Sequence, residues 1–181
     1  MKKNIFSLAA LFVVAAAALT LTSCSKDDDG PEETLFGRIE LGVYVNADIL
    51  KYYDVVAEYN DDNGNTVTSP VSTTPKDITV LGTGETLKDM YFAGFSKDNL
   101  KLPVKKTVSV KVSLKEGVEY QGEELTFKYV TRTSYCKHAA GKDASLIGSD
   151  SQGNRTVKSK EAFDKTIDSF NKLFSNLEVS L

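Results

Sequence analysis

Cys136 and His138 are the residues whose types and spacing most directly suggest chemistry, and His138 is the only histidine of the chain. Residues two apart on a strand share a face, so the pair could form a nucleophile with its base, or half of a metal site. A structural zinc site needs about four ligands, and the sequence has no second Cys/His cluster. A nucleophile also needs an oriented base. The sequence therefore favours a buried thiol beside a histidine near a strand end.

Asp61, Asn63 and Asn65 carry oxygen donors at alternate positions, as the first ligands of a calcium loop do. The pattern then stops, because Thr66 stands where the loop needs glycine and Ser72 where it needs a bidentate glutamate. A hairpin turn explains the same residues, since Asn and Gly tolerate the positive φ of such turns. We expect a turn without a metal ion, and no segment predicts a cofactor.

The 25 acidic residues leave an enzymatic alternative open. A glycosidase needs only two suitably placed carboxylates and no sequence motif. Sugar sites also favour exposed aromatic rings, and the chain has no tryptophan. The bulk of the remaining rings predicts that they fill a core or line a sheet face; the candidates are Tyr52, Tyr53, Tyr91, Phe92 and Phe95.

The first 23 residues have the pattern of a secretory signal peptide. Lys2 and Lys3 precede an apolar run over residues 8–19, which is shorter than the roughly 20 residues of a membrane-spanning helix. The run leads to Leu21-Thr22-Ser23-Cys24. This segment resembles the lipobox of bacterial lipoproteins. The resemblance implies cleavage after Ser23 and lipidation of Cys24, which would anchor the protein in a membrane.

The residues after the cysteine, 25–30, include three consecutive aspartates. They resemble the acidic export signal of surface lipoproteins from Bacteroidota-type bacteria, which implies an outer-membrane protein that is exposed at the cell surface. Charge repulsion alone would also keep this segment extended. We therefore expect residues 24–34 to form a lipidated N-terminus with a flexible acidic tether.

Removal of residues 1–23 leaves 158 of the 181 residues and takes away two lysines, so the formal charge changes from −3 to −5. No basic patch is evident, which argues against nucleic acid as a partner. Lipidation of Cys24 would leave Cys136 without a partner for a disulfide. The remaining chain, 35–181, is of ordinary size for one domain that is stabilised by packing.

Alternation of apolar and polar residues predicts strands in most of this domain. Residues 90–95 are apolar at both odd-numbered and even-numbered positions, which indicates a strand buried on both faces. About seven strands separated by turns predict an immunoglobulin-like antiparallel β-sandwich, a resemblance of architecture that implies no function. The predicted strands cover residues 35–45, 52–59, 66–71, 78–81, 90–95, 104–114 and 125–135.

The C-terminal part departs from this pattern. Residues 137–157 are rich in glycine and small polar residues, and we expect a long loop there. Large apolar residues then recur every three or four positions from Phe163 to Leu177, which predicts a C-terminal α-helix over about 159–176. Residues 177–181 could form a short closing strand. Docking of the helix on the sandwich is expected, because its apolar stripe would otherwise face water.

Together these patterns predict a lipid-anchored outer-membrane protein whose sandwich is a non-enzymatic binding, adhesion or accessory module. Its partner would be an envelope protein or a glycan. Two alternatives remain open from the residues alone: a small carboxylate-dependent hydrolase that acts on glycans, and a structural envelope protein without a ligand.

Overall fold

A computed structural model describes residues 34–181 of the chain. The predicted signal peptide, Cys24 and the tether up to residue 33 lie outside the described residues. Neither helix of the described part is long and apolar enough to cross a membrane. In chain order the elements are β1 (Leu35–Val45), α1 (Ala47–Tyr52), β2 (Tyr53–Asn60), β3 (Thr66–Pro70), β4 (Lys76–Thr79), β5 (Thr86–Lys101), β6 (Lys105–Leu114), β7 (Leu125–Ala139), β8 (Ile147–Val157), α2 (Lys160–Leu173) and β9 (Leu177–Ser180).

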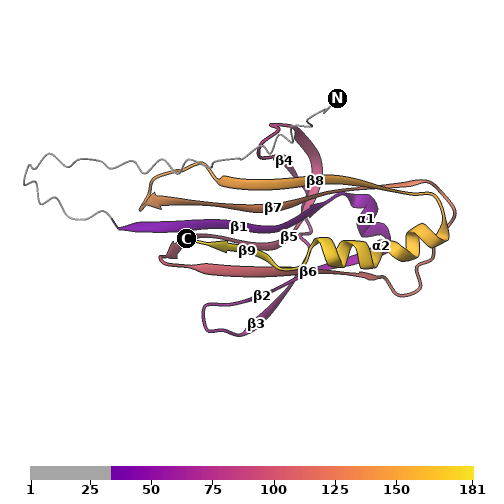
Figure 1. The fold of residues 1–181 in the computed structure, drawn as a ribbon, viewed down its shortest axis with the longest axis horizontal. Coiled ribbons are helices and arrows are strands. Elements are labelled where there is room, and N and C mark those ends of the chain that lie inside the picture. Colours follow the sequence, from indigo (N-terminus) through magenta and orange to yellow (C-terminus); the bar gives the residue numbers. More distant parts are fainter. Residues whose placement is uncertain (1–33) are drawn as a thin grey trace, which may run out of the picture. The chain divides into compact units, whose positions relative to one another are not determined.

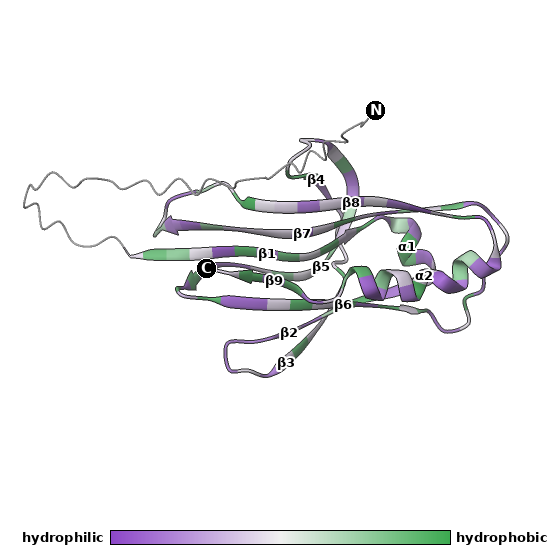
Figure 2. Cartoon of the chain, viewed as in Figure 1, coloured by the Kyte–Doolittle hydropathy of each residue, from purple (hydrophilic) through white to green (hydrophobic). Residues whose placement is uncertain are grey.

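The strands form two antiparallel sheets, so the predicted β-sandwich is confirmed (Figure 1). One sheet has the order β4-β5-β1-β7-β8, and the other has the order β3-β2-β6-β9. The core lies between them and draws alternate residues from each strand. On β6, Val108, Val110 and Val112 are buried while the residues between them are more exposed. Figure 2 shows the resulting interleaving of hydrophobic and hydrophilic residues along β6 and α2.

Helix α2 docks on the sandwich, as its apolar stripe predicts. Ser159 caps its first turn, because its side-chain oxygen accepts a hydrogen bond from the backbone N–H of Ala162. Phe163, Phe170 and Phe174 are all buried. The helix packs on β6 and β8, and the predicted closing strand forms β9 directly after it.

The prediction of a long loop over residues 137–157 is wrong. β7 continues to Ala139, and β8 occupies Ile147–Val157, which leaves only residues 140–146 as a loop. Glycine and small polar residues have low strand propensity, but eleven consecutive pairs with β7 hold β8 in place. β8 and β9 bring the number of strands from about seven to nine. The short helix α1 was also not predicted.

A hairpin crosses the outer face of the five-stranded sheet. β5 pairs with β1 through its second part and with β4 through its first part. We call residues 76–90 the strap. Ile78, Val80 and Met90 of the strap bury a second, smaller core against Tyr44 and Val130 of the sheet. The sheet is therefore covered on both faces at this point, as predicted for residues 90–95.

Strand pairing defines two opposite ends of the sandwich. The start of β1 pairs with the ends of β5 and β7, so it lies with the β5–β6 turn and the loop of residues 140–146. We call this the proximal end. The end of β1 pairs with Tyr91 of β5 and Tyr129 of β7, and it leads into α1, near the β6–β7 loop (residues 115–124) and the start of α2. We call this the distal end.

Candidate functional site

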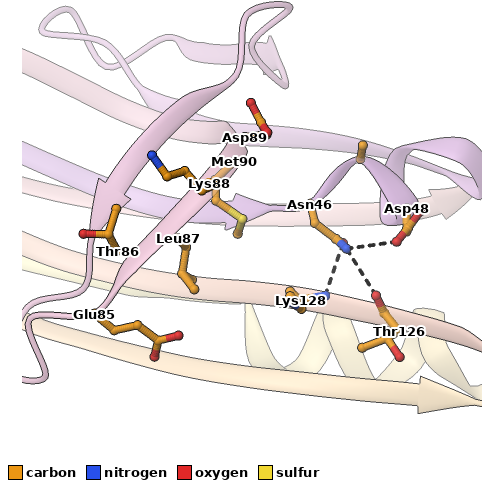
Figure 3. Close-up of a pocket in the computed structure, with 11 residues that line it drawn as sticks. Asn46, Asp48, Glu85, Thr86, Leu87, Lys88, Asp89, Met90, Thr126 and Lys128 are labelled. Carbon is orange, nitrogen blue, oxygen red and sulfur yellow. Dashed lines mark hydrogen bonds between the residues drawn. The ribbon is translucent and has the colours of Figure 1, made fainter.

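A hollow of about 510 Å³ opens at the distal end between the strap and α1 (Figure 3). Its walls come from three separate segments: the β1–α1 junction, residues 85–90 of the strap, and the start of β7. The lining is mostly polar and charged, and consists of Asn46, Ala47, Asp48, Glu85, Thr86, Leu87, Lys88, Asp89, Met90, Thr126 and Lys128.

Asn46 fixes the inner wall of this hollow. It ends β1 and precedes α1, and its side-chain amide bonds across to β7. Its Oδ1 accepts from the backbone N–H of Lys128 at 3.2 Å, and its Nδ2 donates to the Thr126 carbonyl oxygen at 3.2 Å. Nδ2 also lies 3.3 Å from the Asp48 carboxylate. These bonds tie the β1–α1 junction to β7 and occupy the hydrogen-bonding groups of the Asn46 side chain.

The groups free to meet a ligand carry both signs of charge. Asp48 binds Lys51, and Lys88 binds Asp77. Within residues 34–181, the Lys128 ammonium and the Asp89 carboxylate have no ion-pair partner, and both residues are exposed. A lysine and an aspartate around such a polar cavity suit a ligand that is rich in hydroxyl or charged groups.

A second hollow, of about 560 Å³, also lies at the distal end, between the β6–β7 loop and the first turns of α2. Tyr120 stacks on Phe163 there, with ring centroids 5.3 Å apart. Leu114 at its rim is 40% exposed. This hollow therefore offers a partly apolar surface, in contrast to the polar hollow between strap and α1. Sequence reasoning missed both hollows, because their walls come from segments far apart in the chain.

Cys136 and His138 share the outer face of β7 and are both buried, but each is bound to something else. The Cys136 thiol lies 3.6 Å from the Ala144 carbonyl oxygen. His138 Nε2 lies 2.7 Å from Asp98 Oδ1, and its Nδ1 lies 2.9 Å from the Ala139 carbonyl oxygen. Both ring nitrogens are thus occupied by acceptors, and neither serves the thiol as a base. The predicted buried thiol is confirmed.

Asp98 also binds Arg38 through Nε at 2.8 Å and through a second guanidinium nitrogen. The hydrogen bond from Arg38 outweighs burial and lowers the pKa of Asp98 from 3.8 to about 2, with help from the Asn99 N–H and His138. A carboxylate with a lowered pKa stabilises the folded state above its unfolded pKa, and this contribution is lost as the pH falls through the folded value.

We therefore expect Asp98→Asn to lower the free energy of unfolding near neutral pH and to have little effect near pH 2. The loss should stay below about 1 kcal/mol, because both side chains of the pair are about one-third exposed. Urea unfolding of the variant and the wild type at a series of pH values measures the difference. A gap that persists undiminished at pH 2 would contradict this assignment.

The Asp61 segment forms the predicted hairpin turn between β2 and β3. The Asp61 carboxylate accepts hydrogen bonds from the backbone N–H groups of Asn63 and Asn65, at 2.8 and 2.9 Å. Gly64 supplies the positive φ of the turn, at 84°. The carboxylate oxygens therefore hold the turn closed. Among residues 34–181 no group of three or more His, Cys, Asp or Glu side chains is placed to hold a metal ion.

The outer face of the sheet also carries a buried ionic cluster that sequence reasoning missed. Arg132 on β7 donates to both carboxylate oxygens of Asp150 on β8, at 2.9 and 2.6 Å, and to Glu40 on β1 at 2.9 Å. The Asp150 side chain is 0% exposed and Glu40 is 19% exposed. The strap closes the cluster, since the Thr79 carbonyl accepts from Arg132 and the Leu81 N–H donates to Asp150.

The cluster does not line either hollow, and its groups are all paired, so its geometry is that of a stabilising contact between strap and sheet.

The aromatic residues considered for sugar stacking are part of the packed structure as well. Tyr52, Tyr53 and Phe95 are buried, while Tyr91 and Phe92 are partly buried and pack against the two cores. Comparison with known proteins adds no constraint: no family model, curated protein or solved structure matches the chain.

Proposed function

We propose that this chain is a lipoprotein of the bacterial outer membrane, anchored through Cys24 and exposed at the cell surface, whose β-sandwich is a non-enzymatic binding, adhesion or accessory module. The support for the anchor is the signal-like segment that ends in Leu21-Thr22-Ser23-Cys24. The support for binding is the pair of hollows at the distal end.

The proposal rests on one observation: the start of β1 and the two hollows lie at opposite ends of the sandwich. The tether from Cys24 leads into β1 at Leu35, at the proximal end, whereas both hollows lie at the distal end. β1 has 11 residues, and a strand rises about 3.3 Å per residue, so roughly 35 Å separates the ends. The end of the domain that receives the chain from Cys24 is therefore not the end that carries the hollows.

The ligand class follows from the free groups. Lys128 offers a cation, Asp89 and Glu85 offer anions, and the second hollow adds Tyr120 and Leu114 as a less polar surface. An envelope protein segment or a glycan with charged substituents satisfies both kinds of group. A hydrolase would need a pair of carboxylates facing a cleft, and Asp48, Glu85 and Asp89 line the hollow between strap and α1, so a carboxylate-dependent hydrolase stays the second candidate.

Substitution of the anchor residue tests the first half of the proposal. We expect Cys24→Ser to abolish incorporation of labelled fatty acid and to release the domain from membranes or stall its processing, with the fold unchanged. The wild type should incorporate the label in its native host. A wild-type protein with an unmodified, uncleaved N-terminus in mass spectrometry would contradict the anchor.

Crosslinking on intact cells tests the second half. We expect the double variant Lys128→Glu, Asp89→Lys to lose the partner protein or glycan that crosslinks to the wild type. The matched control is Lys165→Glu, which changes an exposed lysine on α2 outside both hollows. If the double variant recovers as much partner as the wild type, the hollow between strap and α1 is not the binding site.

A further inference from the structure

We propose that the strap is a lid. It lifts from the outer face of the five-stranded sheet as one hairpin while the sandwich stays folded, and the hollow between strap and α1 forms only when it is closed. The two arms of the strap pair with each other, from Lys76 opposite Met90 to Thr79 opposite Thr86. The pairing of β5 with β1 begins only at Tyr91. Within residues 34–181, neither arm of the strap pairs with β1, β7 or β8.

A fixed foot and a backbone corner supply the hinge of this lid. The Ser72 N–H donates to the Phe92 carbonyl oxygen at 2.7 Å, and the Phe92 N–H donates to Ser72 Oγ at 2.9 Å. These two bonds tie the chain that enters the strap to the chain that leaves it. Just inside this foot, Asp89 has a φ of 53°, in the left-handed region. A few residues at the end of an element are enough to absorb the rotation of a hinge.

The apolar contacts that hold the strap closed form a small unit of their own. Ile78, Val80 and Met90 pack on Tyr44 and Val130, and none of these residues belongs to the core between the two sheets. Lifting the strap therefore exposes this second core and leaves the main core packed. Because the cost of exposing apolar side chains scales with their area, lifting costs less than unfolding the domain.

The ionic cluster beneath the strap survives lifting. Arg132, Asp150 and Glu40 all lie on strands of the sheet, so the hydrogen bonds among them need nothing from the strap. The strap adds two bonds to the cluster, one from Arg132 to the Thr79 carbonyl and one from the Leu81 N–H to Asp150, each at 2.7 Å. Water replaces both partners when the strap lifts. The cluster is thus a latch that releases without leaving a buried charge unpaired.

Lifting removes one wall of the hollow. Residues 85–90 of the strap form that wall, whereas Asn46 and Lys128 on the opposite side belong to β7 and the β1–α1 junction (Figure 3). A ligand that contacts both walls binds only the closed form, so its binding stabilises closure. This step rests on the proposed function, but the lifting itself does not.

Native-state hydrogen exchange tests the lid on the chain from residue 24 onward, carrying Cys24→Ser. Lifting releases the Leu81 N–H from Asp150, whereas the Val43 amide lies in the ladder of the central strand β1 and is released by unfolding. We expect Leu81 to exchange faster than Val43, with a rate that rises less than about threefold between 0 and about 2 M urea, because lifting exposes little surface. The Val43 rate should rise at least about tenfold over the same range.

Thiol labelling beneath the strap measures the same event independently. In a chain that carries Cys24→Ser and Cys136→Ala, Val130→Cys places the sole thiol under the strap, and the control Val110→Cys places it in the main core. Both valines are at most 1% exposed. We expect the Val130→Cys variant to react with iodoacetamide at least about tenfold faster than the control. Adding Ile78→Ala, which removes an apolar contact of the strap, should speed that reaction by at least about tenfold again.

Equal urea dependence of the Leu81 and Val43 amides, or equal labelling of the two cysteine variants, would show that the strap lifts only when the domain unfolds and would overturn the proposal. Fast exchange at Leu81 without labelling of the Val130→Cys variant would show fraying of the strap tip alone and would equally overturn it. Neither measurement needs a partner, so failure of the lid and failure of the proposed binding function are separate results.

Discussion

Replacing Arg132 with leucine will lower the free energy of unfolding by about 3–5 kcal/mol. The substitution removes the partner of Asp150, whose side chain is 0% exposed and would keep only the Leu81 N–H at 2.7 Å. A buried carboxylate without a counter-charge must be protonated or hydrated, and either process favours the unfolded chain. The strap also loses its contact through the Thr79 carbonyl. Urea unfolding of the two proteins measures the loss.

The matched control is Arg38→Leu, because Arg38 binds Asp98 on the same face of the sheet but is 34% exposed. That pair is partly screened by water, so its loss should cost less than about 1 kcal/mol. The double variant Arg132→Leu, Asp150→Leu should recover part of the stability, since apolar residues of similar volume often replace a buried ion pair without loss. A single variant as stable as the wild type would contradict the burial of the cluster.

Phe170→Ala is expected to cost about 3–5 kcal/mol of unfolding free energy, the range for a large aromatic residue in a core. The ring is 1% exposed and stacks on Phe174 with centroids 5.1 Å apart. It also meets the ring of Tyr129 edge-on at 5.5 Å. The substitution therefore leaves a cavity between α2 and β7 that neighbouring rings cannot fill without leaving their own contacts.

Leu173→Ala on the same helix provides the comparison, because Leu173 is 40% exposed. Its loss should stay near 0.5 kcal/mol, as for other surface substitutions. Thermal and urea unfolding of both variants give the two values. Equal, small effects would indicate that α2 does not pack on the sandwich in solution.

The parts of the fold that the sequence predicts are those whose pattern comes from one buried face. β6 alternates valine with polar residues, and α2 repeats phenylalanine at helical spacing, so both were predicted nearly at their observed bounds. The β2–β3 turn was predicted because Asp61 and Gly64 have specific backbone roles there. Such local signals do not depend on how the sheets are ordered.

β8 and α1 lacked such signals for different reasons. β8 is an edge strand with most residues exposed, so no apolar alternation marks it, and its conformation depends on pairing with β7. α1 has six residues, too few for a repeated apolar stripe, and only Ile49 and Tyr52 are buried. In both cases tertiary contacts override weak local preference.

The ionic cluster and the two hollows could not be predicted from single strands. Glu40 and Arg132 occupy alternate positions of their strands on the face turned away from the main core. Side chains at such positions are normally exposed to water. They are buried only because the strap crosses that face, and the strap is a consequence of β5 being longer than its partner β1. The hollow that Asn46 closes follows from the same arrangement, since the strap forms one of its walls. The second hollow depends instead on the β6–β7 loop meeting the first turns of α2.

The place of β1 in its sheet has a mechanical consequence for a protein held by its N-terminus. β1 lies between β5 and β7 and is antiparallel to both. A load pulling a distal partner away from the membrane acts along the axis of β1, whereas the ladder hydrogen bonds lie across that axis. The bonds on both sides of β1 are then sheared together instead of opening one after another. A domain pulled through β1 therefore resists mechanical unfolding better than one pulled through an edge strand.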